Sequence, residues 1–300
     1  MYGVGGRVAM SLRDAETMNS MESDFSMIEF ASRHVTRAVE LSTALGWSYR
    51  QEDWAFAVAL GKGAVIENAG RLVATAMWWP FGESHATFGM IIVSPSLQGR
   101  GVGRRLVLEL LRQAGDRTVL LNSTREGRRL YEQLGFVPYG RIHQHQGMLS
   151  DDLTPAGPAM GIRAAQRVDF EPIANLDEHV TGMRRRELLK ALFDLGSVAV
   201  VDRLDFVQGY ACSRRFGRGY VIGPVIATDA TDAKALIAEL ASRLAGEFVR
   251  VDVPADSELS SWLEIAGLKQ VDQVVSMHRG PRPTDHGDGR LFALASQSLG

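Results

Sequence analysis

A glycine-rich segment between an apolar run and an amphipathic run constrains the fold of this chain more than any other feature. The apolar residues 91–93 predict a strand, and Gln98–Gly103 predicts a tight turn. Residues 104–112 then alternate apolar and polar side chains at helical spacing. A turn of this kind directs several backbone N–H groups toward one point, at the positive end of a helix dipole. The segment is therefore predicted to bind a phosphate group.

The spacing of the glycines excludes two common classes of phosphate loop. A P-loop needs Lys followed by Ser or Thr after its last glycine, but Gly103 is followed by two arginines. The dinucleotide fingerprint needs glycine at its sixth position, where this chain has Arg104. The pattern that fits is Gln-x-x-Gly-x-Gly, formed by Gln98, Gly101 and Gly103. A glycine-rich turn without a ligand is the alternative.

A second motif follows further along the chain. Residues 118–122 predict a strand, and Ser123–Glu126 has the pattern of a capping box that begins a helix. Gly135 predicts the end of that helix. The helix closes with Tyr-x-x-x-Gly-Phe, formed by Tyr131, Gly135 and Phe136.

These two motifs, in this order, resemble those of the GNAT superfamily of N-acetyltransferases, which bind acetyl-coenzyme A. The resemblance implies an α/β fold, with a mixed sheet covered by helices on both faces. The expected order begins with a strand at Met27 and helices over residues 32–45 and 51–60. Strands over residues 63–67, 71–79 and 84–93 precede the glycine loop, and an extended segment over 136–148 follows Tyr131.

The second half of the chain repeats this order without the loop. Residues 223–233 have no glycine in the corresponding turn, and Asp229 and Asp232 add negative charge there. Leu263 stands opposite Tyr131 when the two halves are aligned on their glycines. The second half is therefore predicted neither to bind coenzyme A nor to donate a proton. Over residues 27–300 the chain resembles tandem GNAT proteins with a degenerate, YitH-like C-terminal domain.

Four segments are expected along the chain. Residues 1–26 predict a flexible extension, because they contain no apolar core. Residues 27–150 predict the catalytic domain, and residues 151–159, which contain two prolines, predict a linker. Residues 160–300 predict the degenerate domain.

The resemblance also assigns roles to individual residues. The residues expected to contact coenzyme A are Ile91, Val93, Gln98, Gly99, Arg100, Gly101, Val102, Gly103, Arg104, Asn122 and Thr124. The alternative role of Thr124 is to cap the following helix. Tyr131 fits the general acid that protonates the leaving thiolate, because a phenol is protonated at neutral pH. A packing aromatic is the alternative for Tyr131.

The general base and the acceptor site are less constrained by sequence. His85 shares the strand face of Ile91 and Val93, and its ordinary pKa suits a base; a solvent-facing histidine is the alternative. Glu83, Asp53 and Glu29 are weaker candidates for the base. Trp47 and Trp54 are expected to line the acceptor pocket, with core packing as the alternative.

Composition limits the possible partners. A net charge of −2 gives no reason to expect nucleic acid or an anionic membrane. The single cysteine, Cys212, suits a reducing cytoplasm and is expected to be a buried apolar residue. His143 and His145 share a strand face but lack a third ligand, so no metal site is expected. The oligomeric state is expected to be monomer or homodimer.

The leading hypothesis is an N-acetyltransferase that uses acetyl-CoA to acetylate a primary amine of a small molecule. A CoA-binding sensor or regulatory protein without turnover is one alternative. An acetyltransferase that modifies a protein terminus or a lysine is the other.

Overall fold

The computed structural model describes residues 25–149, 161–281 and 289–300. The expected linker and nearly all of the expected N-terminal extension lie outside these ranges. The first strand, β1 (Phe25–Glu29), begins two residues before the expected start at Met27.

The first half of the chain has the expected order of elements. Its helices are α2 (Val35–Ala44), α3 (Gln51–Leu60), α4 (Val102–Ala114) and α5 (Arg128–Gln133), with 3-10 helices at Ser32–His34 and Pro95–Leu97. Its further strands are β2 (Lys62–Asn68), β3 (Arg71–Phe81), β4 (His85–Val93), β5 (Thr118–Ser123) and β6 (Val137–Met148).

The helix expected from the capping box at Ser123 begins later than predicted. The Ser123 hydroxyl donates to the carbonyl of Thr124, and the Thr124 hydroxyl accepts from the N–H of Gly127. Both hydroxyls therefore hold a turn, and α5 starts at Arg128.

The second half repeats this order. Its helices are α6 (Phe170–Thr181), α7 (Arg186–Leu195), α8 (Ala230–Ala241) and α9 (Ser260–Ile265), with a 3-10 helix at Arg167–Asp169. Its strands are β7 (Ile162–Ala164), β8 (Ser197–Arg203), β9 (Phe206–Phe216), β10 (Gly219–Ala227), β11 (Phe248–Pro254), β12 (Lys269–Arg279) and β13 (Arg290–Ala293). α6 and α7 are separate helices because Gly182 ends α6 in the left-handed conformation.

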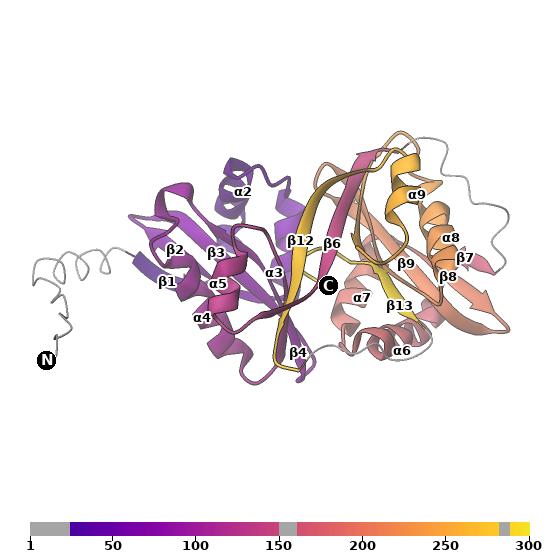
Figure 1. Ribbon diagram of the computed structural model, residues 1–300, viewed down its shortest axis with the longest axis horizontal. Helices are drawn as coiled ribbons and strands as arrows, with labels where there is room; N and C mark the ends of the chain where they lie inside the picture. Colours follow the sequence, from indigo (N-terminus) through magenta and orange to yellow (C-terminus); the bar gives the residue numbers. More distant parts are fainter. Residues whose placement is uncertain (1–24, 150–160, 282–288) are drawn as a thin grey trace, which may run out of the picture.

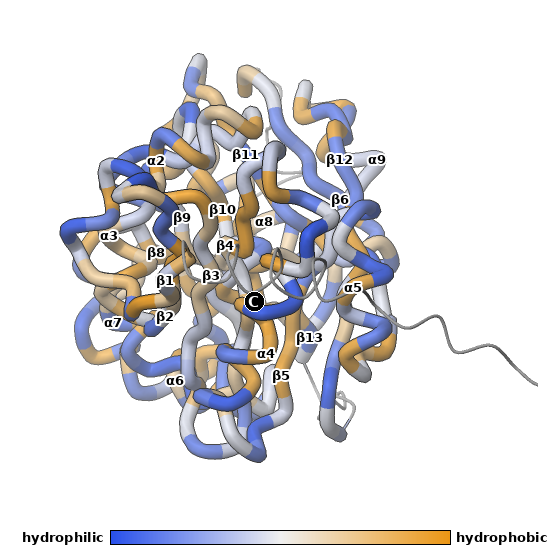
Figure 2. The backbone as a smooth tube through the Cα atoms, turned by 90° about the vertical axis from the view of Figure 1, so that its left-hand side faces the viewer, coloured by the Kyte–Doolittle hydropathy of each residue, from blue (hydrophilic) through white to orange (hydrophobic). Residues whose placement is uncertain are grey.

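The strands form one continuous mixed sheet, in which the two halves exchange a strand (Figure 1). The order is β1-β2-β3-β4-β5-β12-β6-β11-β10-β9-β8-β7, and β13 pairs with β10. β12 of the second half pairs with β5, with Met277 opposite Leu121, whereas β6 of the first half pairs with β11. The exchanged strands are largely hydrophilic (Figure 2). Each half is thus completed by a strand of the other.

Helices cover both faces of the sheet in the first half. Leu106 and Leu110 of α4 pack with Phe88 on one face, whereas α2 and α3 pack with Met90 and Ile92 on the other. Within the described residues, no helix is both long enough and apolar enough to cross a membrane.

The parallel strands β4 and β5 stay together over only part of their length. Residues His85–Phe88 pair with Thr118–Leu121, and beyond Phe88 the strands diverge. At this point Met90 has a positive φ of 50°, and its carbonyl accepts a 2.8 Å hydrogen bond from the Thr75 hydroxyl. This irregularity in β4 is a β-bulge. It leaves an opening in the sheet between β4 and β5, beside the glycine loop.

The corresponding opening in the second half is filled by the chain itself. β10 and β11 pair only through Tyr220 and Val221. Further along, Val225–Ala227 of β10 pairs with β13, and the N–H of Leu294 donates to the carbonyl of Asp252 in β11. β13 therefore occupies the space that stays open in the first half.

Candidate functional site

The glycine loop ends at an uncapped helix N-terminus. Gly101, the N-cap of α4, has a φ of 79° and Gly99 a φ of 73°, a region that favours glycine. No side chain caps α4, and its first turn has no acidic residue. The first intrahelical bond runs from the N–H of Arg105 to the carbonyl of Gly101. The N–H groups of residues 102–104 therefore face outward at the positive end of the dipole.

Neighbouring residues fix the loop and supply positive charge. The side-chain amide of Gln98 donates to the carbonyl of Val93 at 3.1 Å. A β-carbon on Gly103 would lie 3.4 Å from Leu130 of α5, so a glycine here lets α4 approach α5 closely. Arg100 and Arg104 are exposed beside the loop. The loop can therefore hold a pyrophosphate with both N–H groups and guanidinium groups.

The opening between β4 and β5 lies next to this loop. Within the described chain, no strand pairs with the β5-facing edge of β4 beyond Phe88. Backbone groups in the segment that contains Ile91 and Val93 are thus available for an extended ligand that carries amides. This geometry fits the pantetheine arm of coenzyme A.

Tyr131 lies in α5 and is the buried residue of that helix. Its ring packs edge-on against Phe136 at 5.9 Å, and a β-carbon on Gly127 would lie 3.0 Å from it. The ring is buried, but its hydroxyl has no hydrogen-bond partner in the described part of the chain. Burial raises the pKa of Tyr131 above that of an ordinary phenol. The group is therefore protonated at neutral pH and free to donate to a ligand.

The structure gives Asn122 and Thr124 roles other than coenzyme A contact. The Asn122 amide donates to the carbonyl of Gln297 at 2.8 Å and accepts from the Ser276 hydroxyl at 2.8 Å. Both of its polar atoms therefore bind the second half. Thr124 holds the turn before α5 by accepting from the N–H of Gly127, but it is not the cap of α5, which has Gly127 at its N-cap.

The structure does not bring His85 to the glycine loop or to Tyr131. His85 pairs with Thr118 at the closed end of β4 and β5, three residues before Phe88, where the pairing ends. This spacing puts it about 10 Å along the strand from the opening. Its Nδ1 lies 2.9 Å from the Ser84 hydroxyl. Glu83 lies exposed in the adjacent turn. Neither residue is placed to accept a proton at the opening.

We expect His85→Gln to leave kcat and the pH profile of amine acetylation within about twofold of the parent, because a true general base contributes 10²–10⁴-fold. Burial lowers the pKa of His85 below its usual value, so the imidazole is neutral at pH 7. If it were the base, its protonation would reduce activity as the pH falls through that lowered pKa. Loss of an acidic limb in the variant's pH–rate profile would contradict this placement.

The predicted acceptor tryptophans belong to the aromatic core. Trp54 is fully buried, stacks on Phe30 at 5.6 Å and donates to the Ser42 hydroxyl. It therefore packs in the core, which was its alternative. Trp47 is half-buried and lies edge-on to Tyr49.

The two other weaker candidates for the general base are not available at the opening either. One has other partners, and the other lies far from the opening. Asp53 is buried and accepts from Arg50 and from the N–H of Gly217, so it connects the two halves. Glu29 lies in β1, the strand at the far edge of the sheet.

Neither histidine of the His143/His145 pair gathers further ligands. Each ring places a nitrogen 3.2 Å from the Ser260 hydroxyl. Across residues 25–149, 161–281 and 289–300, no group of three or more His, Cys, Asp or Glu side chains could hold a metal ion. Cys212 is fully buried, as expected.

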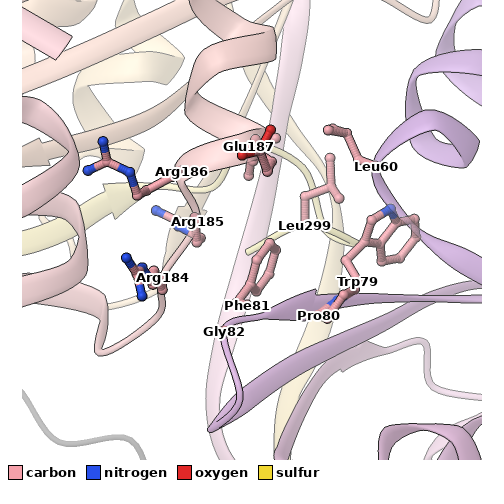
Figure 3. Close-up of a pocket in the computed structure, with 11 residues that line it drawn as sticks. Leu60, Trp79, Pro80, Phe81, Gly82, Arg184, Arg185, Arg186, Glu187 and Leu299 are labelled. Atoms are coloured by element: carbon pink, nitrogen blue, oxygen red, sulfur yellow. The ribbon is translucent and has the colours of Figure 1, made fainter. Parts of the chain in front are cut away.

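A cavity of about 340 Å³ lies between the halves, away from the glycine loop (Figure 3). It is lined by Leu60, Trp79, Pro80, Phe81, Gly82, residues 184–188 and Leu299. Phe81 and Gly82 lie beyond the closed end of β4. The cavity is therefore separate from the opening beside Tyr131.

The helix of the second half that corresponds to α4 is α8, and it has acidic residues at its N-terminus. The Asp229 carboxylate caps α8 by accepting from the N–H groups of Thr231 and Asp232. Asp232 is itself held by Arg203, whose hydrogen bonds lower the pKa of that carboxyl. Leu263, opposite Tyr131, is fully buried. A carboxylate therefore already occupies the N-terminus of α8, and the position opposite Tyr131 has no hydroxyl to donate a proton.

We expect Asp229→Ala to lower the free energy of unfolding by about 1 kcal/mol, because it removes an N-cap. The affinity for acetyl-CoA should not change, since that helix end takes no part in binding. Urea unfolding and calorimetric titration measure the two quantities on the same protein. A weaker affinity for acetyl-CoA in this variant would contradict this prediction, because it would indicate that the second half binds acetyl-CoA.

The sequence did not indicate that a distant segment reaches the opening. Gln297 and Ser298 of the second half lie beside Gly89 and Asn122 of the first, and Tyr49 lies next to Ser298.

Comparison with known proteins agrees with this geometry. Two families, each described as an acetyltransferase (GNAT) domain, match residues 60–138 and 173–293. The uncharacterized N-acetyltransferase YitH of Bacillus subtilis is 26% identical over 281 residues, which cover 91% of this chain and 98% of that protein. The holothin acyltransferase of a Pseudoalteromonas species is 27% identical, over 73% of this chain and 74% of its own length.

A solved structure shares the whole arrangement. The crystal structure of a putative acetyltransferase from Pyrococcus horikoshii matches with a TM-score of 0.77 and 17% identity, over 92% of this chain and 96% of the other. At that identity the match shows a common fold.

Proposed function

This chain belongs to the GNAT superfamily of acetyltransferases and carries two GNAT domains in tandem, and from that premise we propose that its first half acetylates the primary amine of a small molecule. Acetyl-CoA is the acyl donor in this proposal. Residues 27–150 form the catalytic domain, residues 160–300 the degenerate one, and the protein acts in the cytoplasm.

One observation carries the proposal more than any other, namely the contrast between α4 and α8. The N-terminus of α4 presents free N–H groups beside Arg100 and Arg104, whereas the N-terminus of α8 is capped by Asp229. Among the described residues, no strand fills the opening between β4 and β5, whereas β13 fills the corresponding opening in the second half. A donor with a pyrophosphate and an extended amide arm fits the first half alone.

In the proposed reaction, the neutral amine attacks the thioester carbon of acetyl-CoA. The C–N bond forms, the C–S bond breaks, and the leaving thiolate accepts the proton of Tyr131. The raised pKa keeps Tyr131 protonated for this step. The tyrosinate then recovers a proton from water, and the nitrogen of the newly formed amide loses its extra proton to water. No side chain is assigned as the base.

The experiment that tests this proposal is a thiol-release assay with acetyl-CoA and a panel of small primary amines. Amine-dependent release, with the acetylated amine identified by mass spectrometry, is the expected result. Binding of acetyl-CoA without release by any amine or peptide would instead indicate a sensor. Release only with peptides would indicate a protein acetyltransferase.

A further inference from the structure

A segment of the second half, Leu294–Gly300, reaches the first half where β4 and β5 diverge. A β-carbon on Gly89, the first residue beyond the paired part of β4, would lie 3.0 Å from the Cα of Ser298. The Asn122 amide of β5 donates to the carbonyl of Gln297. One residue in each diverging strand thus contacts this segment. Figure 1 shows the end of the chain between the two halves.

The segment lies on the face of the sheet opposite the glycine loop. Phe88 packs with α4 on one face, whereas its neighbour Gly89 points to Ser298. Tyr49 lies next to Ser298, and it packs against the core of α2 and α3 on this second face. An amine that attacks a thioester held in the opening must approach from the face that the coenzyme leaves free.

The side chains around this segment are polar, and their charges are paired. The Gln297 amide donates to Gln144 at 3.2 Å and to Asp252 at 3.4 Å. Asp252 is ion-paired with Arg250 at 2.8 Å. Gln297 and Tyr49 are half-buried, and Ser298 is largely buried but keeps 8% of its surface exposed, so part of each is accessible. The surface therefore offers hydrogen bonds without a net charge that would select an anionic or a cationic group.

We propose that Leu294–Gly300 forms the acceptor-side wall of the transfer site, where Tyr49, Gln297 and Ser298 bind a small amine that carries uncharged hydrogen-bonding groups. This inference rests on the proposed function of the first half. It gives the second half, which lacks the coenzyme A loop, a direct part in the reaction. Ser298 and Gln297 act here as specificity-determining residues.

A tethered amine tests the position of Ser298 without knowledge of the natural acceptor. In the full-length Ser298→Cys variant, 2-bromoethylamine alkylates the new thiol and leaves a primary amine on a thioether, with loss of bromide and a proton. The native Cys212 is fully buried and thereby protected. On addition of acetyl-CoA, we expect the mass of one acetyl group on the residue 298 peptide and one equivalent of released coenzyme A thiol.

Two controls make this result specific. Ser242→Cys places the same tethered amine on an exposed residue just after α8, and it should stay unacetylated. Tyr131→Phe in the Ser298→Cys background should slow the acetylation about 100-fold. An amine at residue 298 that stays unacetylated while the protein binds acetyl-CoA would overturn the proposal. So would a residue 298 thiol that reacts only in urea.

Steady-state kinetics provide a second measurement, with an amine accepted in the panel. Ser298→Ala and Gln297→Ala should each raise the KM for that amine about tenfold through the loss of one hydrogen bond, while the KM for acetyl-CoA stays constant. Ser242→Ala is the matched control, because it removes a serine hydroxyl outside this segment. An unchanged amine KM in both variants counts against the proposal.

The two levels of the proposal fail in different ways. If the unmodified protein acetylates no amine at all, the proposed function is wrong. If it acetylates amines but neither the tether nor the two variants behave as expected, only the acceptor-side wall is wrong.

Discussion

Replacing Tyr131 with phenylalanine is expected to lower kcat about 100-fold while leaving the Kd for acetyl-CoA unchanged, at the lower end of the range for a general acid. The ring is buried against Phe136, and the hydroxyl has no partner among the described residues. Removing that oxygen therefore breaks no contact in the free protein. The loss should appear only when the thiolate leaves. Single-turnover thiol release gives the rate, and calorimetric titration gives the Kd.

The pH dependence sharpens this expectation. Burial raises the pKa of Tyr131, so the protonated form persists well above pH 8. The parent enzyme should therefore lose no activity through Tyr131 between pH 7 and pH 9. Tyr220→Phe in the second half is the matched control and should not change kcat. An unaltered kcat in Tyr131→Phe would show that solvent protonates the thiolate.

Much of the fold could be predicted because it is encoded locally. The glycine loop, the strand before it and the helix after it follow from adjacent residues, and their bounds differ little from the expected ones. The strand exchange could not be predicted in the same way. β6 and β12 are both polar, extended segments at the same place in their halves, and either would fit beside β5. Their choice of partner depends on contacts between residues far apart in sequence.

The candidate site was predictable to the same extent. Strand parity predicts that His85 shares a face with Ile91 and Val93, and this prediction is wrong. The irregular backbone at Met90 reverses the alternation, so Ile91 and Val93 pack on the α4 face with Phe88, and His85 lies on the other face.

The resemblance assigns Asn122 to coenzyme A because of its place near the end of β5, yet its partners, Gln297 and Ser276, come from the second half. Sequence patterns identified the acetyl-CoA side of the site, because that side is formed by residues close together in the sequence. The acceptor side depends on the strand exchange between the two halves.

The glycine loop provides the second large expected effect. Gly101→Asp should weaken acetyl-CoA binding about 100-fold, because a carboxylate at the N-cap competes with the pyrophosphate for the free N–H groups and repels it. The second half shows this arrangement, with Asp229 bonded to the first turn of α8. Calorimetric titration at low and high salt measures the loss. The loss should shrink as salt screens the added charge.

Gly101→Asn separates charge from shape in this experiment. Asn and Asp have nearly the same size and both tolerate the left-handed conformation that Gly101 adopts, so Asn should reduce affinity only a few-fold. Equal losses in the two variants would mean that the loop requires glycine for its backbone alone. The reverse change, Asp229→Gly, should not create a second acetyl-CoA site, because β13 fills the opening between β10 and β11. A free helix N-terminus and an open pair of strands are both needed, and the first half alone combines them.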